Sequence, residues 1–242
     1  MIRIFSFVAS CAGKESHTAA FSDVLARAFI RKAEAEGETV DYERMTGADV
    51  RVDYCRSCVN CFENGFCPLD QTDDMAGLKA KMLEADILFF GTPVYLWQMS
   101  GIAKSVLDRI SYWTHRFELL GKPCLVFSTT DSSHGQEVSA ELALLMRFTG
   151  AAVIDAGTQT MNGIEIDPDE TADRLMKVYR DPASGVTWFQ QNAFLTRVVL
   201  VRRVLRTAED PAQIPDEMRV FRERGLDRYV LMKEAVEDLR RR

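Results

Sequence analysis

Short apolar runs alternate with longer amphipathic segments along the first 156 residues of the chain. Continuous apolar runs are typical of strands that are covered on both faces of a parallel sheet, and apolar residues at helical spacing indicate helices. The pattern predicts strands at residues 2–9, 38–45, 86–91, 123–128 and 151–156. It predicts helices at residues 16–36, 74–84, 100–112 and 136–149. Because strands and helices alternate, we expect right-handed crossovers and an α/β fold built on a doubly wound, five-stranded parallel sheet.

The rest of the chain predicts a helical C-terminal extension, so the expected division is a domain at residues 1–169 and an extension at residues 170–242. Residues 187–206 place apolar side chains at helical spacing, with arginines between them. A break rich in proline and acidic residues follows at 208–215, and residues 215–242 are expected to form one last amphipathic helix. A basic amphipathic helix can lie on a membrane surface, but we favour packing on the core or across a subunit interface.

Composition narrows the class of protein. The chain has 242 residues, of which 47% are hydrophobic, and its formal net charge is −6. This acidic balance argues against binding to duplex nucleic acid. No run of about 18 uncharged apolar residues is present, so we expect no membrane span. The N-terminal residues lack the marks of a signal peptide, and four of the six cysteines lie in one short segment, which together favour the reducing cytoplasm.

In open sheets of this kind, ligands bind beyond the carboxyl ends of the strands. The loop after the first predicted strand, from Ser10 to Thr18, is rich in small hydroxyl residues and opens a helix. Unpaired N–H groups and the helix dipole make such a position suitable for a phosphate monoester. The loop is neither a Walker loop nor a GxGxxG fingerprint. An ordinary turn with Ser16 or Thr18 as the helix N-cap explains it equally well.

The loop after the strand at 86–91, with the helix behind it, carries a more specific pattern. Its residues are Pro93, Tyr95, Ser100, Gly101, Lys104, Asp108 and Arg109. They resemble the P-x-Y…S-G…K…D-R signature of the NAD(P)H-dependent FMN reductases, a branch of the flavodoxin-like superfamily. In the first loop, Ser10, Ser16 and Thr18 resemble that family's phosphate loop, although Ala12-Gly13-Lys14 stands where an arginine is usual. Residues 128–135 resemble the family's third flavin loop.

The resemblance implies a flavodoxin-like fold that binds FMN, with NAD(P)H as co-substrate and a quinone, flavin or other small molecule as electron acceptor. The implied cofactor-binding residues are Ser10, Ala12, Ser16, His17, Thr18, Pro93, Val94, Tyr95, Leu96, Thr129, Thr130, Asp131, His134 and Gly135. It also implies a homodimer or homotetramer. The cofactor carries the chemistry, so no dedicated acid–base residue is required. A plainer interpretation is that residues 95–97 pack in the core and that His17 and His134 are solvent-exposed, while Asp108 and Arg109 are expected to form structural ion pairs.

Four cysteines form a second group of candidate site residues, in a C-x2-C-x2-C-x5-C run that is followed by proline. They are Cys55, Cys58, Cys61 and Cys67. Three thiolates at this spacing can converge from a tight loop, and Gly65 lets the chain turn back to deliver the fourth. The set suits a [4Fe–4S] cluster better than zinc, which is usually held by two separated ligand pairs. The run resembles the compact motif of the iron–sulfur flavoproteins, which combine this fold with FMN.

The cysteines have a plainer interpretation too. A similar cysteine run followed by Asp-Asp-Met, as at residues 73–75, also occurs in FMN reductase-like sequences for which no cluster is implied. The thiols could then simply pack the loop. The sequence therefore predicts an FMN-dependent oxidoreductase, with an electron carrier that relays electrons between a ferredoxin-like partner and FMN through a cluster as the alternative.

Overall fold

The computed structural model describes residues 1–160, 166–210 and 213–241. Its parallel strands are β1 (Ile2–Val8), β2 (Val40–Thr46), β3 (Ile87–Tyr95), β5 (Pro123–Thr130) and β6 (Ala152–Thr160). They lie in the order β2-β1-β3-β5-β6, and a two-residue strand, β4 (Gln98–Met99), pairs antiparallel with β3. This is the flavodoxin-like strand order. The five-stranded parallel sheet predicted from the sequence is thereby confirmed, with β4 as an addition.

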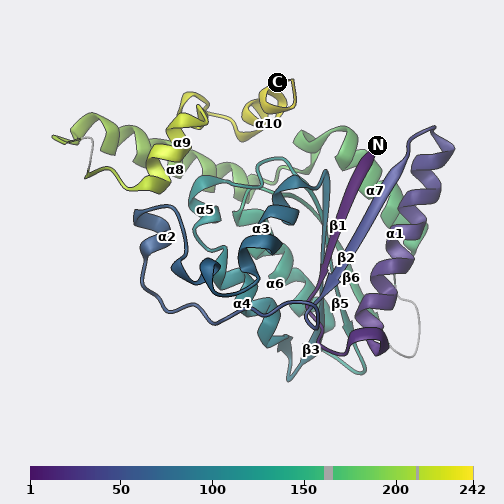
Figure 1. Cartoon of the computed structure of the whole chain (residues 1–242). Coiled ribbons are helices and arrows are strands. Elements are labelled where there is room, and N and C mark those ends of the chain that lie inside the picture. Colours follow the sequence, from purple (N-terminus) through teal and green to yellow (C-terminus); the bar gives the residue numbers. More distant parts are fainter. Residues whose placement is uncertain (161–165, 211–212, 242) are drawn as a thin grey trace.

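Helices cover both faces of the sheet (Figure 1). On one face, α1 (His17–Ala35) and α7 (Pro168–Arg180) pack over side chains such as Ile4 and Phe89. On the other face, α3 (Met75–Glu84), α4 (Gly101–Arg109) and α6 (Gly135–Phe148) pack over side chains such as Phe7 and Phe90. Successive side chains of a strand point to opposite faces of the sheet. Because apolar residues occupy consecutive positions in these strands, both faces of the sheet are apolar and buried.

Three strands run further than the apolar pattern predicts. β3 continues through Pro93 to Tyr95, β5 continues through Thr129 and Thr130, and β6 continues to Thr160. Apart from Val94 and Tyr95, which pair with β4, the added residues are small, polar or proline, so they do not extend the apolar run. At Gly91, a Cβ atom would overlap the ring of Phe127, so the close approach of β3 and this side chain requires glycine.

The C-terminal extension forms a third layer at the end of the molecule where β1 begins (Figure 1). It contains α8 (Trp188–Thr207), α9 (Asp216–Glu223) and α10 (Met232–Arg241), and it packs on the segment that includes the short helix α5 (Trp113–Arg116). The helix predicted at 187–206 is confirmed, and Thr187 and Gln190 form a capping box at its start. Only part of its predicted apolar stripe is buried, since Trp188, Leu195 and Val199 are exposed.

The prediction of one continuous helix over residues 215–242 is wrong. Gly225 adopts a left-handed conformation, with φ of +71°, and α9 ends just before it. The turn lets Phe221 from α9 and Met232 from α10 both bury against α8, which a straight helix could not achieve. Residues 211–212, in the predicted break, and Arg242 lie outside the described residues.

α7 begins at residue 168 and packs against α1 on the sheet, so this helix belongs structurally with the sheet rather than with α8–α10.

None of the helices in the described ranges is both long enough and apolar enough to cross a membrane.

Candidate functional site

The carboxyl ends of β1, β3 and β5 are neighbours, because β3 pairs with both other strands. The loops that follow them enclose a cavity of about 150 Å³, which we call the rim cavity. It is lined by Ser10, Ala12, Glu15, Ser16, His17, Thr18, Pro93, Val94, Tyr95, Thr129, Thr130 and Asp131. All of these except Glu15 are among the residues that the resemblance implies for flavin binding. Glu15 was missed because a lone acidic residue in a loop gives no signal for such a site.

Hydrogen bonds between the loops hold the rim cavity together. The Thr18 and Thr129 hydroxyl oxygens lie 2.7 Å apart and join the loops that follow β1 and β5. The Ser16 hydroxyl caps α1 by accepting from the Ala19 N–H at 3.1 Å. The Ser100 hydroxyl donates to the Ala9 carbonyl at 2.6 Å, which ties the start of α4 to the end of β1. The remaining N–H groups of the first turn of α1 are free of helical partners, so an anion can accept from them.

A tight hairpin forms the outer wall of the rim. Tyr95 pairs with Gln98 across the β3–β4 turn, and Leu96 and Trp97 both have positive φ, at 48° and 64°. Tyr95, Leu96 and Trp97 are 55%, 98% and 66% exposed, which excludes the interpretation that they pack in the core. The Trp97 ring stacks on His134, with centroids 5.2 Å apart and an interplanar angle of 18°. The stack brings the loops after β3 and β5 together above the cavity.

Three residues implied for flavin binding do not line the rim cavity. Leu96 lies at the tip of the hairpin, and His134 contacts Trp97. Gly135 is buried at the start of α6, where a Cβ atom would overlap Thr158 and where its carbonyl accepts from the Ser128 hydroxyl at 2.9 Å. The structure thus gives Gly135 a packing role, because α6 can approach β6 this closely only through a residue without a side chain.

The cysteine run lines a second, larger cavity of about 560 Å³, which we call the cysteine cavity. The four thiols, Cys55, Cys58, Cys61 and Cys67, all belong to its wall. The backbone between them is strongly bent, with positive φ at Ser57, Val59 and Gly65. Burial raises the pKa of the Cys61 thiol, and the neighbouring Cys67 and Cys55 raise it further. Within the described ranges, no three His, Cys, Asp or Glu side chains already form a metal site, so the thiols share a cavity without meeting at one point.

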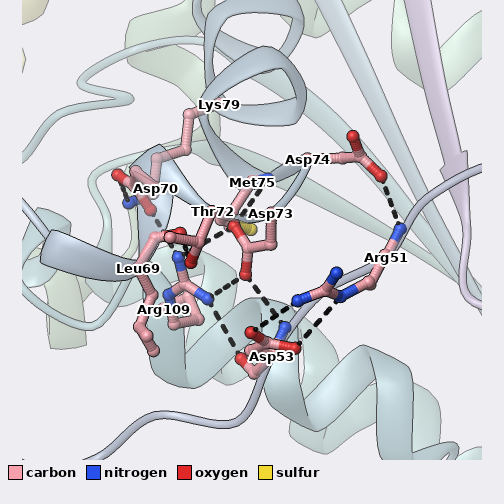
Figure 2. Close-up of polar contacts among 10 residues, drawn as sticks. All are labelled: Arg51, Asp53, Leu69, Asp70, Thr72, Asp73, Asp74, Met75, Lys79 and Arg109. Carbon is pink, nitrogen blue, oxygen red and sulfur yellow. Dashed lines mark hydrogen bonds and ion pairs between the residues drawn. The ribbon is translucent and has the colours of Figure 1, made fainter.

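Arg109 of α4 fastens both ends of the cysteine loop (Figure 2). Its side chain is fully buried, and its Nη1 donates to the carboxylate of Asp73 and to the carbonyl of Asp53. Its Nη2 donates to Asp70 at 2.6 Å. Asp53 precedes the first cysteine, and Asp70 and Asp73 follow the last one. One guanidinium therefore bonds both ends of the loop, in the fork geometry that arginine provides, beside direct hydrogen bonds such as that from the Asp53 N–H to Asp73.

The predicted structural ion pairs at the end of α4 are confirmed. Asp108 pairs with Lys104 one turn earlier, at 2.6 Å, whereas Arg109 reaches across to the loop. Sequence spacing identifies the first pair, but it gives no signal for the second, because its carboxylates lie 36 and 39 residues away. The Nε of Arg109 is buried and has no hydrogen-bond partner, and Arg109 itself lines the cysteine cavity.

The buried contact between Arg109 and Asp73, which we call the clamp, predicts how the free energy of unfolding changes as the pH falls. Burial raises the pKa of Asp73, but hydrogen bonds from Arg109 and from the Asp53 and Met75 N–H groups outweigh burial and hold the pKa below its ordinary value of 3.8. The stabilisation is therefore complete above the pKa of the unfolded chain and is lost as the pH falls through the lower pKa of the folded protein. Urea unfolding between about pH 5 and 2 should show this loss. Asp73→Asn should lack that component, and an equally steep loss in the variant would contradict the assignment.

Comparison with known proteins agrees with the fold. The strand order defines a flavodoxin-like fold, and the rim cavity lies at the switch in strand order. Residues 2–164 match the NADPH-dependent FMN reductase family, and the chain belongs to this family of oxidoreductases.

Curated relatives match part of the chain. An iron–sulfur flavoprotein of Clostridioides difficile is 26% identical over 119 residues, 49% of this chain and 49% of the relative. An iron–sulfur flavoprotein of Archaeoglobus fulgidus is 32% identical over 89 residues, 37% of this chain and 40% of the relative. The chain thus spans half or less of the length of these relatives. Among solved structures, RosB with bound 8-demethyl-8-formylriboflavin-5′-phosphate has 14% identity, covers 87% of this chain and 89% of its own, and superposes with a TM-score of 0.54. At this identity it supports the fold alone.

Proposed function

We propose that the chain binds FMN at the rim cavity and takes hydride from NAD(P)H, passing the electrons to a quinone, another flavin or a similar small acceptor. The observation that carries this proposal is that one cavity gathers residues from the three loops that the family resemblance implies, joined by the hydrogen bond between Thr18 and Thr129. FMN would supply the redox chemistry when bound. The protein's task is to bind it, orient it and leave one ring face open.

The residues of the rim fit such a cofactor. A cavity of about 150 Å³ is smaller than typical ligand pockets, so it suits a phosphate and part of a ribityl chain rather than a whole flavin. The phosphate would accept hydrogen bonds at the N-terminus of α1, near Ser16 and Thr18. The ring would lie over the edge of the cavity, against Pro93 and Tyr95. Pro93 has a fixed φ, which keeps this wall rigid.

Hydride transfer is tested by rapid mixing of the FMN-loaded protein with NADPH or NADH in the absence of oxygen. We expect the flavin absorbance to bleach with at least one of the two nucleotides, at a rate on the order of 1–1000 per second, as for ordinary enzymes. A variant with Trp97→Ala reports whether the hairpin shapes this step. Failure of both nucleotides to bleach a fully loaded flavin would contradict the proposed donor.

A second function, electron relay through a [4Fe–4S] cluster, is favoured by the cysteine cavity. The donor set fits, since Cys55, Cys58, Cys61 and Cys67 line one cavity large enough for a cluster. Four thiolates are the usual ligands of such a cluster. The buried, unpartnered Nε of Arg109 borders the same cavity and would offer a hydrogen bond and positive charge to an anionic group. A ferredoxin-like partner would then supply or receive single electrons.

The free thiols and the exposed apolar side chains also bear on the cellular compartment and the oligomeric state. The free thiols suit a reducing compartment such as the cytoplasm. Assembly into a homodimer or homotetramer stays a prediction, supported by the exposed apolar side chains of the rim hairpin, and light scattering of the purified protein measures it.

A further inference from the structure

The middle of the cysteine loop, residues 60–66, lies between the residues that Arg109 holds and is not itself contacted by Arg109 in the hydrogen bonds of the described chain. It contains the short helix α2 (Asn60–Glu63), which has no buried residue. Within the loop, Asn60 donates to the Phe66 carbonyl and Asn64 donates to Asn60. Because these local hydrogen bonds are few, contacts with other elements must fix the position of residues 60–66.

One such contact is made by the C-terminal extension at Gly65. This residue has φ of +85°, and a Cβ atom on it would overlap the Asp216 carboxylate and lie 2.8 Å from Nη2 of Arg116. Asp216 begins α9 and pairs with Arg116 of α5. Both side chains of this ion pair are about nine-tenths buried. The loop therefore rests directly on a buried ion pair that joins the sheet domain to the extension.

A second contact is made by Phe62, next to Cys61. Its ring packs edge-on against His115 of α5, with centroids 5.0 Å apart. The Nδ1 of His115 lies 2.6 Å from the carboxylate of Glu217 in α9, and Glu217 also pairs with Arg197 of α8 at 2.9 Å. Arg197 in turn donates through Nε to the His115 carbonyl at 2.9 Å. Glu217 and Arg197 are both buried and the His115 side chain is about half exposed, so the Glu217–Arg197 pair anchors His115 from the interior.

We infer that the C-terminal extension is a positioning element for the cysteine loop. Arg109 fixes the two ends of the loop, while Asp216 and Glu217 of α9 fix its middle, and together they keep Cys61 and Cys67 half-buried in the wall of the cysteine cavity. The purpose of this role rests on the proposed cluster, which the thiolates would bind. Holding the thiols in place is a property of the protein itself, and it is measurable without any metal.

The test is residue-resolved alkylation of the metal-free, fully reduced, full-length protein, followed by mass spectrometry. The chain carries its own references: Cys11 is exposed, and Cys124 is fully buried in β5 and reports global unfolding. Glu217→Gln and Asp216→Asn should raise the alkylation rates of Cys61 and Cys67 about tenfold relative to wild type, and leave that of Cys124 unchanged. The control is Glu223→Gln, because Glu223 lies in the same helix and is 65% exposed.

Gly65→Ala tests the contact from the loop side. Its matched control is Gly37→Ala, since Gly37 has a similar φ of +82° but open space around it. Gly65→Ala should release Cys61 and Cys67, and Gly37→Ala should not. Unchanged rates at both cysteines in Gly65→Ala and Glu217→Gln, or rates that rise only in step with Cys124, would overturn the inference.

Iron reconstitution of the same proteins separates this inference from the proposed cluster. If wild type binds iron and the α9 variants bind less, both stand. If wild type binds no iron while the alkylation pattern still changes as expected, the cluster fails and the positioning role stands.

Discussion

Replacing Arg109 by methionine should lower the free energy of unfolding by about 3–5 kcal/mol, the range for breaking a buried ion pair by removing one partner. Arg109 is fully buried, and so is the side chain of Asp73. Without the guanidinium, Asp73 would keep only the two backbone N–H groups of Asp53 and Met75. Both ends of the cysteine loop would lose their common anchor. Urea unfolding at neutral pH measures the change.

The matched control for this variant is Lys104→Met in the same helix. Lys104 also pairs with an aspartate, Asp108, but both side chains are largely exposed. Exposed pairs contribute about 0–1 kcal/mol, so the control should be nearly as stable as wild type. Equal, small effects of Arg109→Met and Lys104→Met would mean that the buried clamp does not hold the loop.

Replacing Cys58 by serine should abolish iron binding, if the proposed cluster is present. A hydroxyl is a poor replacement for a thiolate toward iron, and the residues that line the cavity include no fifth cysteine. Iron analysis and the visible spectrum of protein purified without oxygen measure the loss. Cys11→Ser is the control, because Cys11 is exposed in the loop after β1 and does not line the cysteine cavity.

The two outcomes of the cysteine experiment decide between the alternatives. Loss of iron and its absorbance in Cys58→Ser, with iron retained in Cys11→Ser, supports the electron-relay function. Wild-type protein without iron after anaerobic purification and reconstitution would leave the thiols as packing residues of the loop. The flavin site would be unaffected, since it is built from other loops.

The parts of the fold that the sequence predicts are those with a local signal. The apolar runs give β1 and the core of β3, and helical spacing gives α1 and α8. The β3–β4 hairpin escaped prediction because Leu96 and Trp97 occupy left-handed positions where asparagine and glycine are the usual signal. Gly225 is itself a helix stop signal in the sequence, but the apolar residues on both sides of it were read as one helix, and packing on α8 shows why the chain turns there.

The same distinction holds for the two cavities. The rim residues follow buried strands, so topology alone brings Ser16, Pro93 and Thr129 to one edge. The cysteines are close in sequence and could be predicted to share a loop. The supports of that loop could not, because Arg109 and Glu217 act through tertiary contacts over dozens of residues. Residues without periodicity or short-range spacing leave no trace that sequence reasoning can use.

The central claim is that the rim cavity binds FMN. The most direct measurement is a calorimetric titration of the cofactor-free protein with FMN, repeated with Thr18→Val and with the control Thr196→Val, whose hydroxyl bonds within α8 on the exposed surface. We expect one FMN per chain, and binding about tenfold weaker in Thr18→Val than in the other two proteins, the cost of one well-placed hydrogen bond. No binding by wild type, or equal binding by all three, would contradict the account.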